Sequence, residues 1–219
     1  MDLQKHHKPT FDNISTEKRV RILDTATKEF AFKGFENANM STIAKKAGVS
    51  VGSLYKYFEN KQDLFLTTIQ YSIQSMEELL NVLAVSEEDV LVKVERIIRE
   101  IQRSSKENAT LIKLYNGMTA ENNPRFASQF AYEMESLTAR IYRVAIEEGK
   151  KAGDIREDID APFAAWLLDN IFMSLQFSYA CDYSIERFRI YAGSDITERD
   201  DFVVEQCLKF VKSALKKQN

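Results

Sequence analysis

The residues of this sequence that could act chemically are polar side chains whose types and spacing suit binding. Residues 39–57 gather Asn, Ser, Thr, Tyr and Lys side chains around a single glycine turn. Such side chains form hydrogen bonds and ion pairs with nucleic-acid phosphates and base edges. A nucleophile with its base is missing, because the only histidines, His6 and His7, lie near the start and neither Cys181 nor Cys207 has a histidine or serine motif beside it.

Other catalytic arrangements are absent from the sequence as well. There is no Gly-rich phosphate loop, and the acidic pairs at 87–88 and 147–148 fit solvated faces of amphipathic helices. Adjacent histidines cannot both face one ion from a helix, so we expect no metal at His6 and His7. Two cysteines are too few for a disulfide framework and are expected to be reduced, mostly buried thiols. We therefore expect that the protein is not an enzyme and that it uses no cofactor.

The stretch from Asn39 to Ser50 has the parts of a helix-turn-helix. A capping Asn39 opens a short helix, small residues at 44 and 47 allow close packing, and Gly48 makes the turn. Ser50 then caps a second helix, in which Leu54 and Phe58 point inward at a spacing of four residues. Small residues at the start of that helix would let it enter a major groove. The side chains predicted to face outward are Val51, Gly52, Ser53, Tyr55, Lys56 and Tyr57.

Residues 18–64 resemble the DNA-binding domain of the tetracycline-repressor (TetR) family. The resemblance implies a homodimer of all-helical subunits, each with a three-helix head and a ligand-binding body, that reads a palindromic operator. A helical hairpin that merely packs is the much weaker alternative, because the motif is dense. The residues that carry the resemblance are Ile43-Ala44, Ala47-Gly48-Val49-Ser50, Gly52-Ser53-Leu54-Tyr55, Tyr57-Phe58, Lys61, Leu64, Phe30 and Gly34-Phe35.

The resemblance also implies roles for single residues. Asn39, Ser41, Tyr55, Tyr57 and Lys61 would contact phosphates, and residues 51–53 would lie nearest the base edges. Many relatives carry Lys where Val51 stands, so a phosphate or guanine contact is missing here and an apolar contact with a thymine methyl becomes possible. Ser41 and Lys56 could equally be solvated helix residues. The candidate DNA-binding residues are Asn39, Ser41, Thr42, Ser50, Val51, Gly52, Ser53, Tyr55, Lys56, Tyr57 and Lys61.

The elements that position these residues are helices. With 44% apolar residues, seven Gly and three Pro in 219 residues, and apolar spacings of three to four, the chain is predicted to be all-α. No apolar run approaches the roughly 20 residues of a membrane span, and the polar start is unlike a signal peptide, so we expect a cytoplasmic protein without membrane contact. The predicted helices cover about 16–33, 40–47, 51–57, 61–83, 87–104 (capped by Ser86), 107–116, 125–152, 161–181 and 198–217, with breaks at Gly117, Pro124, Gly153, Pro162 and Gly193.

Charge divides the chain as well. Residues 1–64 hold 11 Lys or Arg against 8 Asp or Glu, whereas the remainder holds 19 against 25, which suggests an N-terminal module that meets phosphate. We expect a flexible tail over 1–15, the helix-turn-helix domain over 16–60, and an effector-binding and dimerisation domain over 61–219. The tail, with Lys5 and Lys8, could instead reach a minor groove as a basic arm, although disorder is the more common state of such a terminus.

The body is expected to supply a dimer face. Residues 161–181 are apolar almost all round, so such a helix must be buried on two faces, one in its own subunit and one against a partner. The last helix would complete this face through Phe202, Val203, Leu208, Phe210 and Val211.

The body is also expected to hold a pocket for a small lipophilic or aromatic effector. Most of its Met and aromatic residues are ordinary core, but a bundle pocket combines such residues with a few polar ones, here Tyr71, Asn170 and Gln176. A dimeric DNA-binding regulator without a small-molecule switch, controlled by a partner or acting as an activator, is the alternative. The candidate ligand-binding residues are Tyr71, Tyr115, Met118, Phe130, Met134, Trp166, Asn170, Met173, Gln176 and Phe177.

Overall fold

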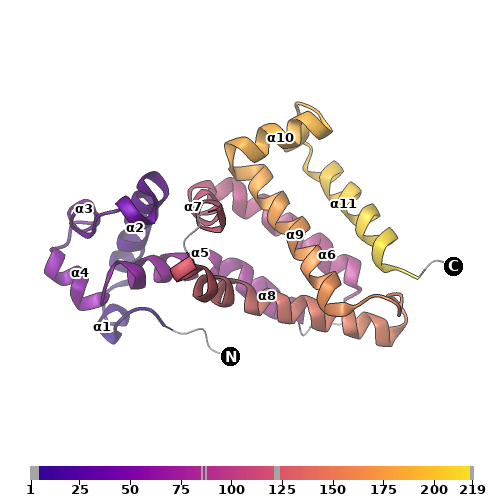
Figure 1. Ribbon diagram of the computed structural model, residues 1–219, viewed down its shortest axis with the longest axis horizontal. Coiled ribbons are helices and arrows are strands. Elements are labelled where there is room, and N and C mark those ends of the chain that lie inside the picture. Colours follow the sequence, from indigo (N-terminus) through magenta and orange to yellow (C-terminus); the bar gives the residue numbers. More distant parts are fainter. Residues whose placement is uncertain (1–4, 85, 87, 121–123, 218–219) are drawn as a thin grey trace. The chain divides into compact units, whose positions relative to one another are not determined.

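The computed structural model of the chain is all-α, as predicted, and it describes residues 5–84, 86, 88–120 and 124–217 (Figure 1). The described part contains no strand. Its helices are α1 (Pro9–Asp12), α2 (Thr16–Asn37), α3 (Met40–Lys46), α4 (Val51–Tyr57), α5 (Lys61–Ala84), α6 (Val90–Glu107), α7 (Ala109–Ala120), α8 (Pro124–Ala152), α9 (Ala161–Ala180), α10 (Asp182–Ala192), the 3₁₀ turn η1 (Ile196–Glu198) and α11 (Asp200–Leu215).

The chain divides into two compact units. The first comprises residues 1–74 and 113–121, and the second comprises 75–112 and 122–219. Helix α5 therefore contributes residues to both units.

The first unit is built on α2, α3 and α4. The Ser15 hydroxyl caps α2 by accepting a hydrogen bond from the Lys18 amide at 3.3 Å. Aromatic rings then join α2 to α5, because Phe30 and Phe65 meet edge to face at 5.0 Å between ring centroids. Short helices α3 and α4 pack on this core, which fixes them although neither exceeds two turns.

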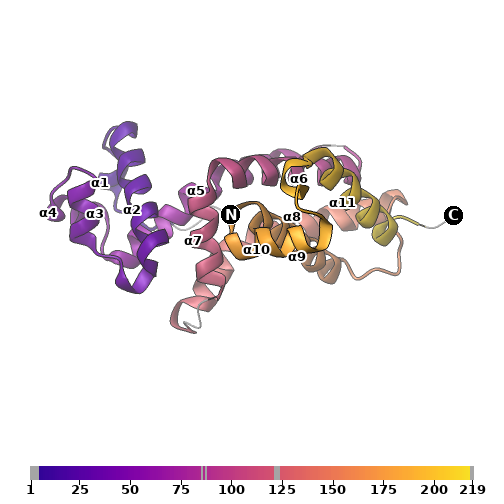
Figure 2. The same ribbon diagram turned by 90° about the horizontal axis from the view of Figure 1, so that it is seen from above.

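The second unit is arranged around α9. Figures 1 and 2 show this helix beside α6, α8 and α10, with α11 lying along α6. Its buried face includes Ala165, Leu168 and Phe172, and the Phe172 ring meets Tyr142 of α8 at 5.6 Å. This packing gives the second unit an extended hydrophobic core.

Three details differ from the sequence-based prediction. Helices α1 and α10 are additional, because α1 is only four residues long and α10 has no buried residue that would give an apolar period. Asp89 rather than Ser86 caps α6, accepting from the Leu91 amide at 2.7 Å. Gly117 lies inside α7 instead of ending a helix.

Candidate nucleic-acid interface

Both helices of the motif, α3 and α4, begin at a side-chain cap. The Asn39 side-chain oxygen accepts from the amides of Ser41 at 2.8 Å and Thr42 at 3.4 Å. The Ser50 hydroxyl accepts from the Ser53 amide at 3.0 Å and is 2.8 Å from the Ser53 hydroxyl. Gly48, with φ +67°, occupies the left-handed conformation that makes the turn.

Helix α4 presents one face to solvent and the other to the core of the first unit. Leu54 and Phe58 are fully buried, as predicted from their spacing, whereas Tyr55 is 45% exposed and Val51 and Lys56 are exposed too. At Gly52 a Cβ atom would meet only the Ser50 hydroxyl, at 4.0 Å. The start of α4 is thus a shallow, exposed surface of the kind that can approach base edges.

Two further predicted contact residues, Tyr57 and Lys61, are also bonded within the head. Tyr57, predicted to face outward, is only 8% exposed; its hydroxyl accepts from Lys18 Nζ at 3.1 Å, and its ring centroid lies 5.7 Å from that of Phe11. Lys61 Nζ donates to the carbonyls of Glu36 at 2.8 Å and Ala38 at 3.3 Å. Contact of these side chains with phosphate stays a prediction.

Basic residues outside the predicted set brace α3. The Lys46 ammonium lies 2.7 Å from the buried Glu29 carboxylate of α2, and Arg21 Nε donates to the Ala47 carbonyl at 3.0 Å. Neither these pairs nor the bond between Lys18 and Tyr57 has a local sequence signal, because the partners are 17 to 39 residues apart.

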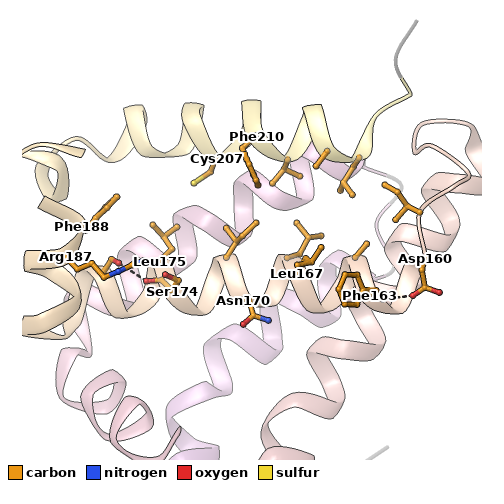
Figure 3. Close-up of a pocket in the computed structure, with 18 residues that line it drawn as sticks. Asp160, Phe163, Leu167, Asn170, Ser174, Leu175, Arg187, Phe188, Cys207 and Phe210 are labelled. Carbon is orange, nitrogen blue, oxygen red and sulfur yellow. Dashed lines mark hydrogen bonds between the residues drawn. The ribbon is translucent and has the colours of Figure 1, made fainter. Parts of the chain in front are cut away.

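The second unit carries an apolar groove of about 800 Å³ between α9 and α11, with α10 at one end (Figure 3). Phe163, Leu167 and Phe210 are exposed along it, and Phe210 is 64% exposed. Phe202 is also exposed, whereas Val203, predicted to complete the dimer face, is buried within its own unit. The groove-lining residues are Ile159, Asp160, Phe163, Ala164, Leu167, Leu168, Asn170, Ile171, Ser174, Leu175, Ser178, Arg187, Phe188, Cys207, Phe210, Val211, Ala214 and Leu215.

The predicted ligand-binding residues do not gather on this groove. Only Asn170 lines it, with its amide nitrogen donating to the Trp166 carbonyl at 2.7 Å. Trp166 and Tyr71 are exposed, and the other described members, Tyr115, Met173, Gln176 and Phe177, are partly buried. The side chains of Met118, Phe130 and Met134 lie outside the described residues.

Carboxyl groups on facing helices of the second unit interact with a buried tyrosine. Burial, together with the smaller effect of the negative charge of Glu135 on α8, raises the pKa of Asp169, on α9, to about 6. Burial and the same two carboxylates raise the pKa of the Tyr142 hydroxyl. Folding therefore opposes the ionisation of Asp169.

The described residues offer neither a metal site nor a membrane span. Among them, no group of three or more His, Cys, Asp or Glu side chains could hold a metal ion. No described helix is long and apolar enough to cross a membrane.

Known proteins that are similar to this chain point to one family. Residues 22–68 match the model of the bacterial regulatory proteins of the tetR family. A fatty acid metabolism regulator protein of Bacillus subtilis (strain 168) is 25% identical over 165 residues, which cover 69% of this chain and 77% of that protein.

Solved structures share the fold. A TetR family transcriptional regulator from Chloroflexus aurantiacus matches with a TM-score of 0.68 and 22% identity over 97% of this chain and 99% of that one. The transcriptional regulator FadR of Bacillus subtilis, in complex with stearoyl-CoA, matches with a TM-score of 0.70 and 19% identity over 85% and 95% of the two chains.

Proposed function

Because this chain belongs to the tetR family of bacterial regulatory proteins, we propose that it binds a palindromic operator as a homodimer, represses transcription there, and is released by a small lipophilic effector. The observation that carries the DNA-binding part is the face of α4. Its N-terminus is capped by Ser50, its inner side is anchored by Leu54 and Phe58, and its outer side exposes Tyr55. A rigid, exposed helix start is what direct readout in a major groove requires.

Dimerisation is supported by the groove between α9 and α11. Exposed Phe163, Leu167 and Phe210 would leave a contiguous apolar surface in water, and such surfaces mark interaction sites. A two-fold partner would cover the same patch on both subunits. It would also place two recognition helices for successive major grooves about 34 Å apart.

Release by an effector is proposed as a population shift. A ligand that binds one conformation of the body more tightly favours that conformation, and operator affinity falls if the two recognition helices then no longer match adjacent grooves. The relative FadR was solved with stearoyl-CoA, which supports a lipophilic effector for this chain.

Operator selection from random duplex DNA tests the DNA-binding proposal. We expect wild-type protein to enrich a palindrome at a stated salt concentration, and Tyr55→Ala to lose that enrichment. Phe32→Ala is the matched control, because Phe32 is an aromatic residue of the same unit that is 82% exposed and lies outside the candidate face. Enrichment of no sequence at any salt concentration would refute the proposal.

The effector proposal is tested separately by thermal denaturation with stearoyl-CoA and a panel of lipophilic compounds. A ligand that binds only the native state raises the melting temperature once its concentration exceeds its Kd. The same compound must lower operator affinity, since equal affinity for both conformations shifts nothing. A regulator without a small-molecule switch would respond to none of them.

A further inference from the structure

Helix α4 is too short to define its own geometry. It has seven residues, and an isolated helix of that length is not stable in water. The last four carbonyls of any α-helix have no partner inside the helix, so the C-terminal end must be fixed from outside. In α4 these are the carbonyls of residues 54–57.

Residues of the N-terminal segment occupy three of those four carbonyls. The Leu54 carbonyl accepts from the Phe58 amide in the usual capping manner. The next three are bonded by the segment: Lys8 Nζ donates to the Tyr55 carbonyl at 3.1 Å, the Thr10 hydroxyl donates to the Lys56 carbonyl, and the Lys8 amide donates to the Tyr57 carbonyl at 2.7 Å. Every carbonyl of the last turn of α4 thus has a donor.

Apolar packing holds the same segment against the same helix. Phe11 is 2% exposed, and its ring centroid lies 4.8 Å from that of Phe58 and 5.7 Å from that of Tyr57. A further ion pair, between Lys8 Nζ and the Glu59 carboxylate at 2.6 Å, ties the segment to the residues that follow α4. Hydrogen bonds and apolar burial from the N-terminal segment therefore both act on the C-terminal end of α4.

The segment has its own internal bonds, which give it a defined shape. Pro9 begins α1, and His7 Nε2 lies 2.9 Å from the Asp12 carboxylate. Lys5 Nζ lies 3.1 Å from the same carboxylate and does not bond to α4. The sequence favoured a flexible tail over residues 1–15; residues 5–15 instead carry these contacts, which no local pattern reveals.

We propose that Lys8, Thr10 and Phe11 form an N-terminal clip that positions the recognition helix α4 for operator binding. Without the clip, the last turn of α4 frays in the free protein and must be ordered when DNA binds, which lowers affinity. The clip residues act through α4, so they are positioning residues and not DNA contacts. The proposal rests on the proposed function only for its DNA-binding part.

Amide hydrogen exchange of the free protein tests the clip without DNA. In Phe11→Ala we expect the amides of residues 54–58 to exchange at least about tenfold faster, while those of residues 22–30 in α2 keep their protection. Thr10→Val keeps the branched shape and removes only the hydroxyl donor, so it should accelerate the same amides by a smaller factor. Unchanged protection of residues 54–58 in both variants would overturn the proposal. If Phe11→Ala also speeds the exchange of the α2 amides, the exchange of residues 54–58 in Thr10→Val alone decides whether the clip exists.

Operator affinity, measured on the selected sequence at several salt concentrations, tests the consequence. We expect Phe11→Ala to weaken binding about tenfold and Thr10→Val about threefold, with the slope of log affinity against log salt unchanged, because no phosphate contact is lost. Lys5→Ala is the control: it removes a cation of the segment that does not bond α4. If Lys5→Ala weakened binding as much and reduced the slope by about one, the segment would be a basic arm and the clip would be refuted. Failure of wild-type protein to select an operator would remove the proposed function, and hydrogen exchange would still decide the clip.

Discussion

Single lysines of the head differ in what they can contribute, because some are already bonded within the protein. Lys61 bonds two carbonyls at the end of α2, and Lys46 pairs with buried Glu29. Lys45 and Lys56 are exposed. A bonded lysine must give up its partner before it can meet a phosphate, so we expect the exposed pair to dominate the salt dependence of DNA binding.

The neighbouring residues Lys45 and Lys46 therefore make a matched pair for substitution. Lys46→Gln leaves the Glu29 carboxylate buried without its ion pair, and we expect it to lower the free energy of unfolding by about 1–2 kcal/mol. Lys45→Gln is expected to leave stability within about 0.5 kcal/mol. Urea denaturation measures both. Equal effects of the two substitutions would contradict a structural role for the Lys46 pair.

Asp169 links the stability of the second unit to pH. Its pKa is about 6 in the folded protein, against 3.8 for a carboxyl group in water. The neutral form therefore contributes stability below about pH 4, and this contribution is lost as the pH rises from about 4 to 6. We expect Asp169→Asn to raise the melting temperature at pH 7.5, by an amount equivalent to about 1–2 kcal/mol after allowance for partial exposure, and to have little effect at pH 3.5.

The test compares melting temperatures of wild-type and Asp169→Asn protein across that pH range. A difference that does not grow between pH 4 and 6 would mean that Asp169 titrates normally. Asp154→Asn, at an exposed position of the same unit, is the control and should show no such trend.

At the scale of elements, α3 and α4 are short helices whose ends are fixed by other parts of the chain. Asn39 and Ser50 cap their N-termini, and Arg21 donates to the carbonyl of Ala47 after α3. Stability of the motif therefore lies in its turns and caps more than in helix propensity.

The turn at Gly48 gives a prediction at this scale. Its φ of +67° is strained for a residue with a Cβ atom, although a Cβ there would meet no atom within 4 Å. Gly48→Ala is expected to cost about 1 kcal/mol in the free energy of unfolding, and Gly48→Asn less, because Asn tolerates the left-handed region. Chemical denaturation compares the two. Equal losses would point to a steric rather than a conformational cause.

At the scale of the whole molecule, the exposed groove between α9 and α11 is the feature that most affects assembly. Its exposed apolar residues come from α9 and α11, and α9 buries its other face within the unit. That exposure is costly in water, and a second copy of the chain would relieve it.

Assembly can be tested by placing a charge in the groove. Phe210→Glu is expected to shift the protein from dimer to monomer in sedimentation equilibrium, because two-fold symmetry would bury the charge twice. Tyr183→Glu is the control, since Tyr183 is an exposed aromatic residue of α10 that does not line the groove. A wild-type protein that sediments as a monomer at micromolar concentration would contradict the proposed dimer.

The sequence by itself determined the helical class and the helix-turn-helix, because both depend on local features. The periodic placement of Leu54 and Phe58, the capping Asn39 and Ser50, and the turn glycine at 48 act within one or two helical turns. Such features can be recognised without knowing which distant segment lies nearby.

Only the tertiary structure decided what the ends of the short helices bond to and which apolar faces stay open. The bonds from Lys8 and Thr10 to the last turn of α4 span 46 or more residues, and burial of Val203 but exposure of Phe210 on the same helix depends on where α6 and α9 pass. Periodicity states that a residue is apolar, but the packing of distant segments determines whether its neighbours cover it.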